Sequence, residues 1–175
     1  EIESLVGRDA VHQGVCAELA EPLIYTKLEI ALQRAENGPT QPVFVLLDEL
    51  QDPHNVGAII RSAAAFGASG ILMPEHDQVQ VTPTVIKASA GAVFALPIIH
   101  IGNINTTLRN LKDKGYWTYA LAGTGDTQLD KATFDTSVVI VVGNEGEGIR
   151  PKTLEVCDFK LSIPISSTVE SLNAS

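Results

Sequence analysis

The chain has 175 residues, of which 45% are apolar and 19% are charged. This composition provides enough apolar side chains for one packed domain and excludes a wholly disordered chain. The longest apolar runs, such as residues 138–142, fall far short of the roughly 20 residues that a membrane-spanning helix needs. The first residues carry acid where a signal peptide carries base. We therefore expect a soluble, cytoplasmic protein with no membrane contact.

The sequence is acidic, with a net charge of −9. A general nucleic-acid binder neutralises phosphates with a basic face, so this charge argues against one, although it leaves room for a small basic site. The two cysteines and four histidines show none of the spacings that mark metal or redox sites. We therefore expect no bound metal.

The first 42 residues differ in character from the rest. Residues 8–15 read as a short strand that ends near a glycine, and residues 23–36 have mild helical spacing that stops at Asn37-Gly38-Pro39. A segment of this length cannot bury a core of its own. It is interpreted as a linker, or as the tail of a preceding unit.

From residue 43 onwards, apolar runs typical of buried strands alternate with stretches of helical spacing. The predicted strands cover residues 43–47, 70–73, 96–101, 116–122, 138–142 and 159–163. The predicted helices cover residues 56–66, 84–90, 104–114 and 152–156, and another begins at Val169. Strands separated by helices of this length predict an α/β fold with a mostly parallel sheet flanked by helices.

A ligand of such a sheet binds outside the carboxyl ends of the strands, so the loops after the strands are the places to examine. In the first loop Asn55 stands where a helix N-cap belongs. Arg61 follows one turn after Gly57 and Ala58, whose small side chains would let a guest reach the guanidinium. The same pattern equally fits a plain helix cap and a solvated arginine.

Three glycines, Gly143, Gly146 and Gly148, follow a later buried strand, which indicates backbone that must approach a ligand closely. No Lys-Ser or Lys-Thr follows, which excludes a P-loop, and too little chain remains for a dinucleotide-binding half. An elaborate tight turn is the alternative. Residues 163–175 add several hydroxyls and an amide, which would suit either a polar ligand or a capped helix start.

Taken together, these segments resemble the three ordered motifs of the SpoU-type RNA 2′-O-ribose methyltransferases, which belong to the knotted SPOUT superfamily. The first reads DPHNVGAIIRSA (residues 52–63), the second GNEGEGI (143–149), and the third IP (163–164) with SLNAS (171–175). Among subfamilies, the chain is most similar to the bacterial enzymes that methylate a guanosine ribose in large-subunit ribosomal RNA.

The resemblance implies S-adenosyl-L-methionine (AdoMet) as methyl donor, an RNA substrate, a deep trefoil knot, and a homodimer with the active site near the subunit boundary. By position in the motifs, the implied cofactor-binding residues are Gly143, Gly146, Gly148, Ile163 and Leu172. The implied catalytic residues are Asn55, Arg61, Glu145, Ser171 and Asn173.

Within this resemblance two roles are open for Arg61, which either activates the 2′-hydroxyl as a base or stabilises charge near it. Because the pKa of arginine exceeds ~12, the free base is a costly species. We therefore favour an Arg61 that holds the adjacent phosphate and stabilises the developing alkoxide.

Related enzymes carry an RNA-binding domain before the position of residue 43. Residues 1–42 resemble the tail of such a domain plus a linker, and residues 43–175 resemble the methyltransferase domain without its final helix, which would leave the knot incomplete. A preceding domain that supplied most of the RNA affinity would account for the acidic charge. The expected function is 2′-O-methylation of ribosomal RNA. The alternatives are a transfer-RNA 2′-O-methyltransferase and a non-catalytic RNA-binding or assembly factor, and retention of the catalytic set argues against the last.

Overall fold

The computed structural model describes residues 2–7, 12, 14–18, 25–166 and 172–174. Its strands are β1 Val43–Asp48, β2 Gly70–Pro74, β3 Ile98–Ile101, β4 Trp117–Leu121, β5 Thr127–Gln128, β6 Val138–Gly143 and β7 Phe159–Ser162. Its helices are α1 Ile2–Val6, α2 Leu28–Glu36, α3 Pro53–Ala65, α4 Pro83–Ala88, α5 Ile104–Asp113 and α6 Pro151–Val156, with short 3-10 turns η1 Ala92–Phe94 and η2 Leu129–Lys131.

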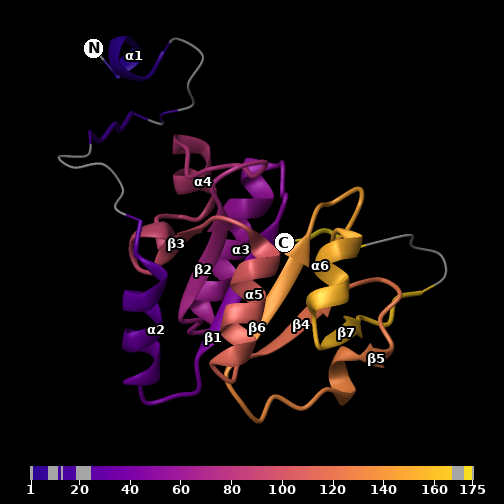
Figure 1. Cartoon of the computed structure of the whole chain (residues 1–175). Coiled ribbons are helices and arrows are strands. Elements are labelled where there is room, and N and C mark those ends of the chain that lie inside the picture. The colour runs from indigo at the N-terminus through magenta and orange to yellow at the C-terminus, as the bar shows by residue number, and fades with distance from the viewer. Residues whose placement is uncertain (1, 8–11, 13, 19–24, 167–171, 175) are drawn as a thin grey trace.

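The seven strands form one sheet in the order β3-β2-β1-β6-β4-β7-β5, and each neighbouring pair runs parallel (Figure 1). Helices cover both faces of this sheet. Even-numbered β1 residues such as Phe44 and Leu46 pack in the core cluster beneath α2, α5 and α6. Odd-numbered ones such as Val45 and Leu47 pack beneath α3 and α4. This arrangement confirms the predicted α/β class and explains why the central strands are continuous apolar runs.

The element ends differ from the predicted ones where a polar side chain or proline decides them. Helix α3 begins at Pro53 because Asp52 caps it, its side chain accepting from the His54 N–H at 2.8 Å. The prediction of Asn55 as the cap is therefore wrong. Strand β5 was not expected, since two residues leave no periodicity to read.

The N-terminal expectations meet the structure only in part. The helix predicted over 23–36 begins at Leu28, and before it Thr26 forms a parallel bridge with Ile99 at the β3 edge of the sheet. The strand predicted over 8–15 and the helix start at Val169 lie largely or wholly outside the described residues.

The strand order puts a topological switch point between β1 and β6. From β1 the chain proceeds outward to β2 and β3 on one side, while β6 pairs with β1 on the other, from Val43↔Val138 to Asp48↔Gly143. A crevice at the carboxyl ends of such strands is the usual ligand position in an open α/β sheet. The loops that carry the first and second motifs therefore emerge side by side.

Candidate functional site

The second motif folds as a tight hairpin directly after β6. Asn144 and Gly148 form an antiparallel bridge, with N–H···O distances of 3.0 and 2.9 Å. The Asn144 side-chain oxygen also accepts from the N–H groups of Gly146 at 2.8 Å and Glu147 at 3.2 Å. A Cβ at Gly143 would overlap the backbone of Gly148 and Ile149. The close approach expected at these glycines is thus made, at Gly143, by the hairpin's own backbone.

Hydrogen bonds and ion pairs between three pairs of residues hold this hairpin to the end of β1. The Asn144 side-chain amide donates to the Glu49 carbonyl at 2.8 Å. The fully buried Asp48 carboxylate accepts from the Arg150 backbone N–H at 3.1 Å and from Arg150 Nε at 2.8 Å. Arg150 Nη1 reaches Glu49 Oε1 at 2.6 Å. The end of β1 is therefore joined to the hairpin and to Arg150 just after it, and the contacts of Arg150 are charge-assisted.

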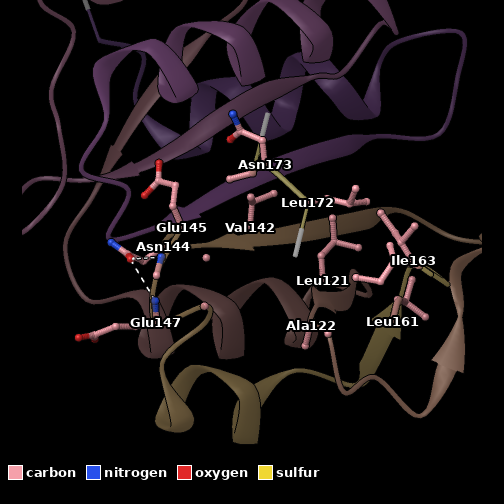
Figure 2. Close-up of a pocket in the computed structure, with 16 residues that line it drawn as sticks. Leu121, Ala122, Val142, Asn144, Glu145, Glu147, Leu161, Ile163, Leu172 and Asn173 are labelled. Carbon is pink, nitrogen blue, oxygen red and sulfur yellow. Dashed lines mark hydrogen bonds between the residues drawn. The ribbon is translucent and has the colours of Figure 1, made fainter. Parts of the chain in front are cut away.

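A pocket of about 410 Å³ opens beside the hairpin at the carboxyl ends of β4, β6 and β7. Apolar side chains, among them Leu121, Leu161 and Ile163, gather at one end, and the polar hairpin residues Asn144, Glu145 and Glu147 gather at the other (Figure 2). The C-terminal residues 172–174 return to the same edge and complete the lining. The pocket therefore offers one apolar and one polar end to a ligand.

The first motif meets the second at the polar end of this pocket. Asn55 lies in the first turn of α3, is only 8% exposed, and donates from Nδ2 to Glu145 Oε1 at 2.7 Å. Glu145 itself is exposed at the pocket rim. The contact joins residues 90 positions apart and uses one of the two carboxylate oxygens of Glu145.

The structure brings most of the expected site residues together. The expected residues that line the pocket are Gly143, Glu145, Gly146, Gly148, Ile163, Leu172 and Asn173. Asn55 joins them through Glu145. Ser171 lies outside the described residues.

Arg61 is exposed on α3, outside the pocket lining, and lies about 9 Å along the helix axis from Asn55. Gly57 is small for a reason other than the one expected, because a Cβ there would collide with Ala88 of α4. It is α4, therefore, that occupies the space at Gly57 that was expected to admit a guest.

Sequence reasoning missed one wall of the pocket. Leu121, Ala122 and Gly123 line it at the end of β4 and were not among the expected site residues. Their place after a predicted strand on the ligand-binding edge was the available signal. Asp48 and Arg150 were missed as well, because nothing local distinguishes a strand-end carboxylate with a distant partner.

The described part of the chain gives little support for a metal site or for a reactive thiol. No cluster of three or more histidine, cysteine or acidic side chains there could hold a metal ion. Burial raises the pKa of the Cys157 thiol to about 12, so it is not a thiolate at neutral pH. Within the same residues, no helix has the length and apolar character needed to cross a membrane.

Solved structures with this fold include two determined with AdoMet. The SpoU methyltransferase AviRb from Streptomyces viridochromogenes, in complex with AdoMet, is 26% identical, with a TM-score of 0.73 over 81% of this chain and 55% of that one. The AdoMet-bound rRNA methyltransferase from Sinorhizobium meliloti is 30% identical, with a TM-score of 0.71 over 86% of this chain and 56% of that one.

Curated relatives of similar sequence are also named as RNA methyltransferases. An uncharacterized tRNA/rRNA methyltransferase of Synechocystis sp. is 38% identical over 170 residues, which are 97% of this chain and 44% of that protein. The 23S rRNA (guanosine-2′-O-)-methyltransferase RlmB of Xanthomonas campestris is 39% identical over 171 residues, or 97% of this chain and 68% of that protein. The chain thus spans from under half to about two thirds of the length of these relatives.

The profile of the SpoU rRNA Methylase family matches residues 42–175. That span contains all three motifs, the hairpin and the pocket lining. The family resemblance expected from the motifs is confirmed, and the chain belongs to the SpoU rRNA methylase family.

Proposed function

We propose that the protein transfers a methyl group from AdoMet to a ribose 2′-hydroxyl of RNA. The observation that carries the proposal is the Asn55–Glu145 hydrogen bond at the polar end of the pocket. It joins an amide and a carboxylate from two distant motifs beside a cavity large enough for a small-molecule ligand. Two family members with this fold were solved with AdoMet, which supports the choice of cofactor.

The residues present suit AdoMet. Leu121, Val142 and Leu161 offer apolar surface for an adenine ring or an aliphatic chain, and the hairpin backbone offers polar groups. Glu145 and Glu147 place carboxylates near the rim, where a cationic donor is favoured over a neutral one. When bound, AdoMet supplies an activated methyl group on a sulfonium.

The chain's own residues would then orient and stabilise the nucleophile. Asn55 holds Glu145 by one carboxylate oxygen, which leaves the other for a substrate hydroxyl. Asn173, at the rim, would bind the ribose or the cofactor. Arg61, as a guanidinium, would hold the phosphate next to the target ribose and stabilise the negative charge that develops on the 2′-oxygen.

We further propose ribosomal RNA as the substrate, with a guanosine of the large subunit as the target. The 39% identity to a 23S rRNA (guanosine-2′-O-)-methyltransferase favours this choice. Transfer RNA is the second candidate, since other curated relatives are named for both RNAs. We assign residues 43–175 to the methyltransferase domain and residues 1–42 to a segment before it, whose helix α2 packs on the core of that domain. We propose that the active species is a homodimer.

Two measurements test the proposal. Calorimetric titration of the purified chain with AdoMet should show binding, and absence of binding to a folded chain would reject the enzymatic function in favour of a non-catalytic RNA binder. Mapping of 2′-O-methyl groups in RNA from cells that lack the protein should show one lost site in large-subunit ribosomal RNA. Loss of a site in transfer RNA instead would select the second substrate.

A further inference from the structure

Hydrogen bonds and ion pairs hold the second-motif hairpin in place, and apolar side-chain packing contributes little. Its residues 145–148 are all exposed, and Ile149 is the hairpin side chain that enters the core. An exposed loop without packed side chains has many accessible positions unless hydrogen bonds restrict it. The direction of Glu145 toward Asn55 therefore depends on whatever fixes the hairpin to β1 and α3.

The Asp48–Arg150 pair is the strongest of these restraints. Asp48 ends β1 opposite Gly143 of β6 and is 0% exposed, and both of its oxygens accept from Arg150, one from the backbone and one from Nε. A carboxylate removed from water has no comparable alternative partner, so its pairing is highly directional. Asp48 thus holds both ends of the hairpin, Gly143 through the strand ladder and Arg150 through its carboxylate.

Glu49 extends the same restraint. It accepts from Arg150 Nη1 through its side chain and from the Asn144 amide through its carbonyl. Glu49 has a left-handed backbone, with a φ of 61°, which a side-chain-bearing residue adopts only where its surroundings enforce it. We call Asp48, Glu49 and Arg150 together the β1–hairpin clasp.

We propose that the β1–hairpin clasp positions the cofactor pocket, with Arg150 as a positioning residue that acts through Glu145 and the hairpin backbone. The inference rests on the proposed function of the pocket. A role of Arg150 as a phosphate ligand fits the geometry less well. Its guanidinium, with a side chain 44% exposed, already faces two carboxylates, so the clasp carries a net negative charge.

The test replaces the ion pair without leaving a buried charge. Arg150→Gln alone would strand the Asp48 carboxylate and endanger folding. The double variant Asp48→Asn/Arg150→Gln keeps neutral hydrogen-bonding groups of similar size. The matched control is Lys152→Gln, which removes one positive charge two residues away, at an exposed position of α6. Arg150→Lys keeps the positive charge but replaces the planar guanidinium, which bonds both carboxylates, with a compact ammonium.

Two readouts are needed, AdoMet affinity by calorimetry and hydrogen exchange of the ligand-free hairpin at residues 144–149. In the double variant we expect affinity to fall about tenfold or more, because small displacements of a positioned site are costly. Amide hydrogen exchange at the hairpin residues should become faster, while the amides of β1 and β6 stay protected. Lys152→Gln should match the wild-type chain in both readouts, and Arg150→Lys should fall between them.

The outcomes separate this inference from the proposed function. Unchanged hairpin exchange in a folded double variant would overturn the positioning role, whether or not affinity fell. Unchanged affinity together with faster exchange would overturn it too, since a loosened hairpin would then not matter to the pocket. If the wild-type chain bound no AdoMet, the proposed function would fail, and with it the claim that the clasp serves a cofactor pocket.

Discussion

Asn55 Nδ2 donates to Glu145 Oε1 at 2.7 Å, linking the first turn of α3 to the hairpin after β6. Asn55 was expected to cap α3, but Asp52 does so, and Asn55 lies inside the first turn of the helix, where its amide makes this contact. The bond orients a carboxylate at the mouth of the pocket, and neither residue could do so alone. It is the point at which the first two motifs become one site.

Asn55→Asp should abolish this hydrogen bond and place two carboxylates in contact. We expect the proposed methyl transfer to fall about 10²–10³-fold, as for loss of one transition-state donor, with the fold retained. Single-turnover methyl transfer at saturating AdoMet measures the effect. Adding Glu145→Gln restores a donor–acceptor pair in reverse and serves as a control for the fold only, because it also removes the Glu145 carboxylate. Near-wild-type transfer by the single variant would contradict a role for the bond.

Arg61→Ala should lower methyl transfer by about 10²–10³-fold without unfolding the chain, because the side chain is exposed on α3 and outside the core. Arg61→Lys should also be slow, since an ammonium lacks the planar fork that holds a phosphate at two points. Turnover at saturating RNA and a thermal melt are the measurements. Wild-type turnover by the alanine variant would rule out a role for Arg61 in methyl transfer.

Alanine substitutions at Gly143 and at Gly146 should affect the stability of the chain differently. Gly143→Ala should destabilise the chain by about 1–3 kcal/mol, because its Cβ would overlap the backbone of Gly148 and Ile149. Gly146→Ala should leave stability unchanged, since the nearest described atom to its Cβ is Asn144 Oδ1 at 3.6 Å. Urea unfolding distinguishes the two. If the hairpin wraps a cofactor, Gly146→Ala will nevertheless weaken AdoMet binding, and equal affinity would show the hairpin to be only a turn.

His100, which lies in the edge strand β3, should make the free energy of unfolding depend on pH. Its ring stacks on Tyr25 with centroids 3.4 Å apart, and its Nε2 lies 2.8 Å from Gln80 Oε1. Burial lowers the pKa of His100 below its ordinary value of 6.5, with Glu75 opposing the shift in part. The unfolded chain therefore binds the proton first as pH falls.

The contribution of His100 should accordingly be complete above pH 6.5 and decline as pH falls from there through the lowered pKa of the folded state. The free energy of unfolding in urea, measured between pH 5 and pH 8 for the wild-type chain and for His100→Gln, isolates it. The variant should show a shallower decline. Identical slopes for the two proteins would rule out a titrating His100 as the cause.

Much of the fold was readable from sequence because its signals are local. The apolar runs over 43–47 and 138–142 predict buried parallel strands, and both are found at the centre of the sheet. Gly67 and Gly115 directly follow the predicted helices 56–66 and 104–114, and both adopt the positive φ that suits a residue at a helix end. The glycines of residues 143–149 and their place after a strand likewise indicated either a ligand loop or a tight turn, and residues 143–148 form a hairpin that lines the pocket.

What the sequence could not determine is which distant polar groups become partners. Asp48 and Arg150 are 102 residues apart, and Asn55 and Glu145 are 90 apart. Their meeting follows from β6 entering the sheet beside β1, and strand order is set by the packing of both faces at once and not by any local period. The tertiary structure thus decided that Gly57 makes room for α4, that Asn55 meets Glu145, and that the buried Asp48 carboxylate pairs with Arg150.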